Sequence, residues 1–120
     1  MNSNIIKIGR INWSVAKAAH IKCADIVITR NYLQHINNTH SKELEQLGMD
    51  AFGYVQFIVT NYNTIRKGSG DSILLVVDTN AKISHIAATT LIYNEKKEYW
   101  QIKTAQPRAT EAVRKKKKLW

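Results

Sequence analysis

"SILLVVD" at residues 72–78, "KISHIAATTLIYN" at 82–94 and "EYWQIKTA" at 98–105 decide the fold of this chain. Each segment is rich in β-branched and aromatic residues, and short polar stretches typical of turns separate them. This pattern predicts an antiparallel meander of three strands. The first segment is apolar on both faces and is expected to be central in the sheet, whereas the third alternates and is expected to bury Trp100 and Ile102 on one face only. The opposite face of the sheet would then be left for a ligand.

Helices are expected to precede this meander. Residues 5–30 are predicted to be extended, then helical, then extended. Residues 51–62 form the clearest helical pattern, with apolar side chains at steps of three and four and Asp50 as the N-cap. The length of 120 residues fits a single domain over residues 1–120. The predicted fold is therefore α+β, with N-terminal helices packed on a C-terminal antiparallel sheet of about four strands.

Two of the four histidines, His35 and His40, lie five positions apart in the segment "NYLQHINNTH". A helix is predicted over about 31–37, and five residues along an unbroken helix would separate the two side chains by about 140° around its axis. The two imidazoles converge only if the helix breaks between them. Asn37 and Asn38, which tolerate the left-handed backbone conformation, are expected to supply that break before a second short helix.

Histidine suits acid–base chemistry because its ordinary pKa of about 6.5 lets the imidazole both donate and accept a proton near neutral pH. Two converging imidazoles would form an acid–base pair. The competing interpretation is structural, since histidines beside helix ends are often solvated or hydrogen-bonded to a carbonyl group. The other two histidines fit that interpretation better, His20 as a helix-end residue and His85 as a neutral imidazole packed on a strand.

Positive charge dominates the composition. The chain has 18 Lys and Arg against 9 Asp and Glu, a formal charge of +9, so a polyanion is the expected class of partner. The strand end "QIKTAQPR" carries Lys103, Thr104 and Arg108, and a cation and a hydroxyl there would hold a phosphate and stabilise the charge that develops on it. Arg66 and Lys67, directly after the long helix, are further candidates for phosphate binding. An ordinary polar strand end and solvated surface cations are the competing interpretations.

The last segment of the chain is the most basic. Pro107 is expected to end the last strand, and a basic tail or short helix is predicted over 108–120. Its lysine run would bind nucleic acid nonspecifically through counterion release, or stay solvated. The tail therefore indicates affinity for polyanions rather than specificity.

Several classes of chemistry lack their motifs. The sequence has no glycine-rich phosphate loop, no activated Ser or Cys motif and no carboxylate cluster for Mg²⁺. The single Cys23 cannot form an internal disulfide and no Cys and His cluster has zinc spacing, so no metal and no cofactor are expected. No apolar run approaches the roughly 18 residues of a membrane span, and a secretory signal is not expected. The remaining His, Lys, Arg and Thr side chains suit metal-free cleavage of RNA, in which the ribose 2′-hydroxyl is the nucleophile.

The order of these motifs resembles the barnase, EndoU, colicin and RelE-like (BECR) ribonuclease superfamily, especially its phage and polymorphic-toxin branches. The matching features are "IVITRNYLQHINNTH", an amphipathic helix followed by "NTI", a strand meander, "YWQIKTAQP" and the closing "KKKKLW", from about residue 24 onward. The resemblance implies a BECR-like fold and singles out His35 and His40 as catalytic acid and base, with Thr104 as an active-site hydroxyl. Lys103 and Arg108 are added from the charge argument alone. A general-base Glu of the barnase kind has no certain match, which leaves the roles of the two histidines open.

The resemblance also implies a function. It predicts a metal-independent endoribonuclease toxin domain that cleaves RNA, with tRNA favoured, to a 2′,3′-cyclic phosphate and a 5′-hydroxyl. Such a domain would act as a monomer in the cytoplasm of a bacterial target cell and would have a cognate immunity protein. Delivery within a larger secreted or phage protein, as in contact-dependent growth inhibition, is left open. The alternatives are a noncatalytic basic module that binds RNA or DNA, and an adaptor whose charge meets an acidic protein.

Overall fold

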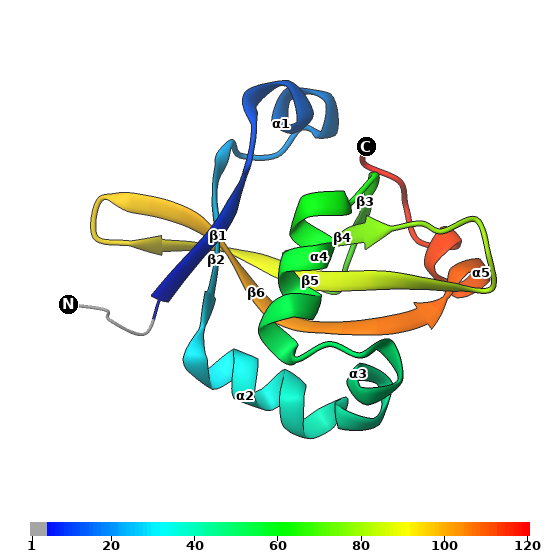
Figure 1. Ribbon diagram of the computed structural model, residues 1–120. Helices are drawn as coiled ribbons and strands as arrows, with labels where there is room; N and C mark the ends of the chain where they lie inside the picture. Colours follow the sequence, from blue (N-terminus) through cyan, green and yellow to red (C-terminus); the bar gives the residue numbers. More distant parts are fainter. Residues whose placement is uncertain (1–4) are drawn as a thin grey trace.

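The computed structural model describes residues 5–120 and shows an α+β fold around one six-stranded sheet (Figure 1). Its strands are β1 (Ile5–Ile11), β2 (Ala24–Thr29), β3 (Thr64–Lys67), β4 (Ser72–Val77), β5 (Ile83–Asn94) and β6 (Lys97–Ala109). Its helices are α1 (Trp13–Ala19), α2 (Arg30–Thr39), α3 (Ser41–Leu47), α4 (Ala51–Asn61) and α5 (Thr110–Arg114). The predicted α+β class is confirmed, but the expected number of strands is too low because β1, β2 and β3 also join the sheet.

The strand order is β1-β2-β6-β5-β4-β3, and every neighbouring pair is antiparallel except β2 and β6. The predicted meander is confirmed as β4, β5 and β6, and the apolar β4 lies inside the sheet between β5 and β3. The parallel contact places Ile26 of β2 opposite Trp100 of β6. It joins the N-terminal β1-α1-β2 unit to the meander, although the two are far apart in the sequence.

The larger part of the hydrophobic core lies between the sheet and its helices. Tyr54 and Ile58 of α4 are fully buried, and they belong to the same apolar cluster as Leu75 of β4. Trp100 and Ile102 are also buried in this cluster, as their alternation in the sequence predicts. Complete burial of one such apolar side chain typically contributes about 1.5 to 3 kcal/mol. The helix predicted over 51–62 is therefore held by its apolar face.

The opposite face of the sheet is partly covered. A second, smaller apolar cluster joins Leu74 and Val76 of β4, Ile86 of β5 and Val113 of α5. Val113 is only 2% exposed, so α5 is packed on this face rather than extended into solvent. The expectation that this face is left open is therefore wrong where α5 covers it.

Helix α2 is longer than predicted. Its N-cap Thr29 accepts a hydrogen bond from the main-chain N–H of Tyr32 at 3.2 Å, and the helix continues through Asn37 and Asn38 to Thr39. The expected break at the two asparagines is wrong. Ile36, which is fully buried, anchors this turn of the helix, and such packing outweighs a weak stop preference.

The prediction that Pro107 ends the last strand is also wrong. β6 continues to Ala109, and Pro107 lies opposite His85 of β5. Proline cannot donate a hydrogen bond, so it is tolerated in a sheet only where its neighbour on that side is missing. The pairing of β6 with β2 extends only to Gln101, which leaves that side of β6 without a strand at Pro107.

The lysine-rich segment after α5 is folded onto the edge strand β3. The main-chain N–H of Lys67 donates to the carbonyl of Lys117 at 2.8 Å, and the N–H of Leu119 donates to the carbonyl of Ile65 at 2.8 Å. Figure 1 shows this segment returning alongside β3. A covered edge strand cannot pair with another chain, so the segment predicted as a basic tail has a structural role.

Candidate functional site

Of the predicted catalytic residues, His35 lies on α2 and Thr104 on β6, two elements that pack against each other, and His40 lies between α2 and α3. The ammonium group of Lys103 on β6 donates a hydrogen bond to the Tyr32 hydroxyl of α2 at 3.1 Å, and it lies 4.8 Å from the centre of the Tyr32 ring. The register of β6 against β5 shifts between Ile102 and Thr104, so Lys103 is the extra residue of a β-bulge. A bulge redirects a side chain relative to its neighbours, and here it allows the Lys103 cation to reach α2.

His35 and Thr104 flank this contact. His35 lies one helical turn after Tyr32 and is exposed, and Thr104 follows Lys103 on β6 and is half-buried. Residues three apart on a helix are neighbours on its surface, so His35 and Tyr32 share one side of α2. We call the group of Tyr32, His35, Lys103 and Thr104 the α2–β6 corner. Among the described residues no hydrogen bond joins His35 to Lys103 or Thr104.

The side chain of Thr104 points in a different direction from that of Lys103. It pairs with Ala88 of β5, and Ala88 packs against the apolar cluster beneath α5. Residues directly opposite each other on antiparallel strands point to the same face of the sheet. The Thr104 side chain therefore lies on the face of the sheet that carries α5, whereas Tyr32 of α2 packs against the core on the opposite face, which carries α4.

His40 is separated from His35. Because α2 is unbroken as far as Thr39, the two side chains are separated by about 140° around the axis. His40 ends α2 and precedes α3, with φ −121° and ψ 29°. The predicted convergence of the two imidazoles depended on a break in the helix at the asparagines, and α2 continues through them.

His40 has a different partner, one that was not among the residues predicted from the sequence. Its Nδ1 lies 2.9 Å from Oε2 of Glu43, and its side chain is only 15% exposed. A carboxylate that accepts from Nδ1–H fixes the tautomer and leaves Nε2 free to accept a proton. The spacing of three residues at the start of a helix is visible in the sequence, so Glu43 could have been proposed as the missing carboxylate.

His85 is a packed imidazole, as predicted. Its Nδ1 lies 2.8 Å from the Tyr54 hydroxyl, and its ring makes an edge-to-face contact with Phe57 at 5.6 Å. Burial lowers the pKa of His85 and raises the pKa of Tyr54, whose pKa the nearby Glu43 charge raises further. This group stabilises the contact between α4 and β5.

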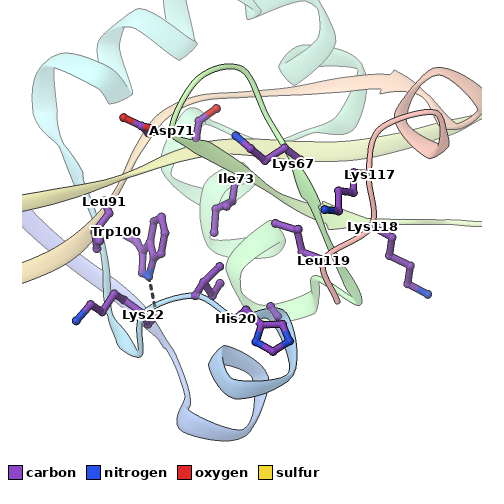
Figure 2. A pocket seen from close by; sticks show the side chains of 13 residues that line it. His20, Lys22, Lys67, Asp71, Ile73, Leu91, Trp100, Lys117, Lys118 and Leu119 are labelled. Carbon is purple, nitrogen blue, oxygen red and sulfur yellow. Dashed lines mark hydrogen bonds between the residues drawn. The ribbon is translucent and has the colours of Figure 1, made fainter.

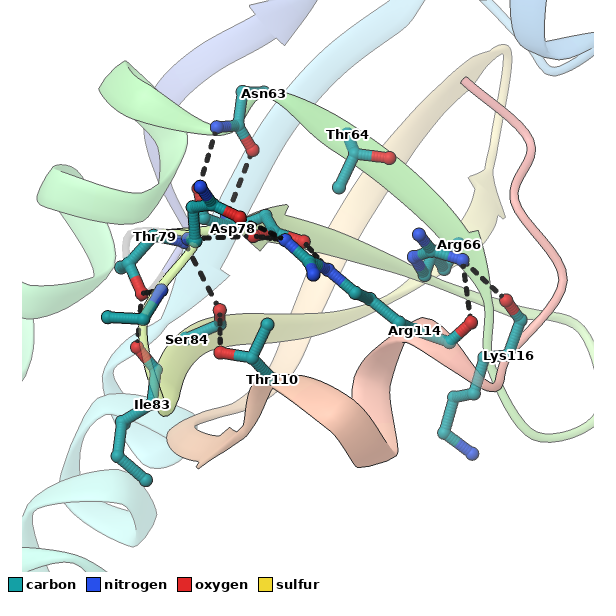
Figure 3. Close-up of polar contacts among 12 residues, drawn as sticks. Asn63, Thr64, Arg66, Asp78, Thr79, Ile83, Ser84, Thr110, Arg114 and Lys116 are labelled. Carbon is teal, nitrogen blue, oxygen red and sulfur yellow. Dashed lines mark hydrogen bonds and ion pairs between the residues drawn. The ribbon is translucent and has the colours of Figure 1, made fainter.

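The expected phosphate ligand Arg66 is occupied elsewhere. Its guanidinium donates hydrogen bonds to the main-chain carbonyls of Arg114 at 3.2 Å and Lys116 at 2.8 Å (Figure 3). These bonds tie β3 to the end of α5 and the segment that follows. Arg66 therefore supports the C-terminal segment and lies outside the α2–β6 corner.

A polar network around Arg114 completes this support. Figure 3 shows its guanidinium against Asp78, with hydrogen bonds of 2.8 and 2.9 Å to the carboxylate. This contact lowers the pKa of Asp78, because hydrogen bonds from a cation favour the ionised carboxylate. The Ser84 and Thr110 hydroxyls lie 2.6 Å apart below it. We interpret this network as the anchor of α5.

Two other predicted residues are also outside the corner. The Lys67 ammonium donates to the carbonyl of Gly70 in its own hairpin. Arg108 is exposed near the end of β6, opposite Ser84 of β5. His20 caps the end of α1 in the left-handed conformation, with φ 57°, which confirms its prediction as a helix-end residue.

The described residues contain no group of three or more His, Cys, Asp or Glu side chains arranged to hold a metal ion. Within residues 5–120, none of the helices is both long enough and apolar enough to cross a membrane. Comparisons of the chain with protein-family models, with curated proteins and with solved structures find no significant match.

Proposed function

We propose that the protein is a metal-independent endoribonuclease whose reaction takes place at the α2–β6 corner. The observation that carries this proposal is the fixed Lys103 cation, held against Tyr32, beside His35 on α2 and Thr104 on β6. A cation next to the helix that bears an imidazole, with a hydroxyl on the following residue of β6, supplies the kinds of group that RNA cleavage without a metal uses.

In the proposed reaction an imidazole removes the proton of a ribose 2′-hydroxyl. The 2′-oxygen then forms a bond to the adjacent phosphorus, and the bond from phosphorus to the 5′-oxygen breaks. A second group donates a proton to that leaving oxygen. The products are a 2′,3′-cyclic phosphate and a 5′-hydroxyl, and the Lys103 charge would stabilise the pentavalent phosphorane between them.

The structure supports the two histidines for different reasons. His35 shares its side of α2 with Tyr32, the partner of Lys103, and its exposed ring is accessible to RNA. His40 has the better oriented ring, because Glu43 accepts from its Nδ1. We assign proton transfer at the corner to His35 and propose that the neighbouring Lys103 ammonium protonates the leaving oxygen. His40, which pairs with Glu43 and lies about 140° around α2 from His35, is the alternative proton-transfer group.

The partner and setting follow from charge and resemblance. A formal charge of +9 attracts RNA through its phosphates, and the resemblance to BECR toxins favours tRNA as the substrate and an immunity protein as an inhibitor. We propose that the domain acts in the cytoplasm of a target cell. Expression without an immunity protein is then expected to arrest growth.

The test is RNA cleavage in excess chelator, with analysis of the product ends. The proposal expects cyclic phosphate ends, and the loss of a proton-transfer group in His35→Ala or His40→Ala should lower the rate by about 10² to 10⁴. An absolute requirement for a divalent metal contradicts the reaction. Wild-type rates in both variants would remove the two histidines from it.

A second candidate function is a basic module that binds RNA or DNA without turnover. One observation favours it: the side chains of Lys115 to Lys118 are all exposed, while the main chain of this segment is held by hydrogen bonds to β3. This function predicts salt-sensitive binding whose slope reports the number of phosphate contacts. Binding without any product in the cleavage assay would select it.

A further inference from the structure

A hollow of about 780 Å³ lies away from the α2–β6 corner, between the loop after α1, the β3–β4 hairpin and the C-terminal segment. Its floor is apolar and includes Ile73, Leu91, Trp100 and Leu119. Figure 2 shows Ile73 and Leu119 reaching into the same space as Trp100. A hollow of this size can hold a small organic ligand, since such sites typically measure about 300 to 1,000 Å³.

The rim of the hollow is strongly basic. Lys22 and His20 lie on the side of α1, and Lys67 and Lys117 lie on the side of β3 and the C-terminal segment (Figure 2). The one acidic residue that lines it is Asp71, which is exposed. The hollow therefore offers an apolar floor to one part of a ligand and several cations to another part.

The main chain beneath these cations is held in place. The Trp100 indole N–H donates to the carbonyl of Lys22 at 2.9 Å, and the N–H of Lys67 donates to the carbonyl of Lys117 at 2.8 Å. Neither main-chain segment has to become ordered when a ligand arrives, which reduces the entropy cost of binding. The Lys22 ammonium makes one loose ion pair with Glu98 at 3.7 Å, with 63% of the lysine side chain exposed. It is thus available to an anion.

We propose that this hollow binds one nucleotide of single-stranded RNA, with the phosphate at its basic rim and the base against the apolar floor. A nucleotide combines the two chemistries that the hollow presents, since its phosphate is anionic and its base has an apolar face. A purely acidic peptide would leave the floor without a partner. The inference rests on RNA as the proposed substrate and not on the catalytic role of any residue at the corner.

The test is binding of a 2′-O-methyl oligonucleotide, which lacks the nucleophile and cannot be cleaved by the proposed reaction. The double variant Lys22→Gln/Lys117→Gln should weaken binding by about tenfold or more, because a hydrogen bond to a charged group is typically worth that factor. Its matched control is Lys115→Gln/Lys116→Gln, which removes the same total charge from exposed lysines that do not line the hollow. Equal weakening in the two variants would overturn the proposal.

A second measurement reports on the floor. The indole N–H resonance of Trp100 should shift when the oligonucleotide saturates the protein, whereas that of Trp13, which is 66% exposed on α1 and does not line the hollow, should move little. Inorganic phosphate, which has no base, should shift the Trp100 resonance less. A Trp100 resonance that stays unmoved at saturation excludes a base on this floor.

Further outcomes distinguish a failure of this binding site from a failure of the proposed cleavage reaction. A polyglutamate peptide that displaces the oligonucleotide, and that loses affinity by the same factor in Lys22→Gln/Lys117→Gln, would assign the hollow to an acidic protein and overturn the nucleotide proposal. Selective loss of oligonucleotide binding in that variant supports the hollow even if no RNA is cleaved. Cleavage with equal binding by both double variants would support the proposed function and reject this site.

Discussion

Arg66→Gln tests whether this arginine supports the fold rather than binding substrate. Its Nη1 donates to two main-chain carbonyls at 2.8 and 3.2 Å, on residues that lie 50 and 48 positions further along the chain. A hydrogen bond from a charged group typically contributes about 1.5 to 3 kcal/mol, and this pair shares one exposed nitrogen. We therefore expect the free energy of unfolding to fall by about 1 to 2 kcal/mol, which lowers the Tm by roughly 3 to 10 °C for a domain of this size.

The assay is urea and thermal denaturation of the variant and of Lys116→Gln. The control removes the same charge from an exposed side chain, and because only the main chain of Lys116 accepts from Arg66, its stability should stay close to that of the wild type. RNA binding measured at a temperature where both proteins are folded completes the comparison. An Arg66→Gln protein with wild-type stability and selectively weakened RNA binding would refute the structural role.

Gly9→Ala should lower stability by about 1 to 3 kcal/mol, because the added Cβ would lie 2.5 Å from Cγ1 of the packed Val59 and overpacking costs that much. Denaturation should show part of the loss recovered in Gly9→Ala/Val59→Ala, and a fully stable single variant would contradict the packing argument. His85 gives a pH dependence: burial lowers its pKa, so the unfolded chain binds more protons and stability should decline as the pH falls below about 6.5. His85→Gln, which keeps a polar group beside Tyr54, should reduce that decline between pH 7.5 and 5.5 in urea titrations, whereas an unchanged pH dependence would assign it to another group.

The meander and the helix α4 could be predicted because their signals are local. The alternation in β6 and the turn chemistry around it identify neighbouring strands, and Asp50 accepts from the N–H of Gly53 at 2.7 Å as an N-cap does. The partner of β2 could not be predicted in this way. Its parallel pairing with β6 joins Val27 to Gln101, and no local pattern specifies a contact over that separation.

The errors at the other elements have identifiable physical causes. The asparagine stop in α2 was overridden by the packing of Ile36, and the proline stop in β6 by the absence of a strand beside Pro107. Residues 108–120 were predicted as a basic tail or a short helix; α5 confirms the helix, but the lysine run after it is not a free tail. Its main chain pairs with β3, because hydrogen bonding by the main chain does not depend on the charge of the side chains.

The candidate site was predictable as a set of residues but not as a geometry. The types of His35, Lys103 and Thr104 suggested RNA chemistry, whereas the bulge that directs Lys103 to Tyr32 depends on a register shift that no sequence pattern marks. Glu43 was visible at a spacing of three from His40 and was missed.

The most direct test of the proposed corner is the rate of RNA cleavage in excess chelator by Lys103→Gln relative to Lys97→Gln. Both changes remove one lysine from β6, but Lys97 is exposed at the hairpin end of the strand, opposite Asn94 of β5. The account predicts that Lys103→Gln loses about 10² or more in rate, as removal of a group that stabilises transition-state charge does, while Lys97→Gln stays close to the wild type. Equal rates for the two variants would contradict a reaction at the α2–β6 corner.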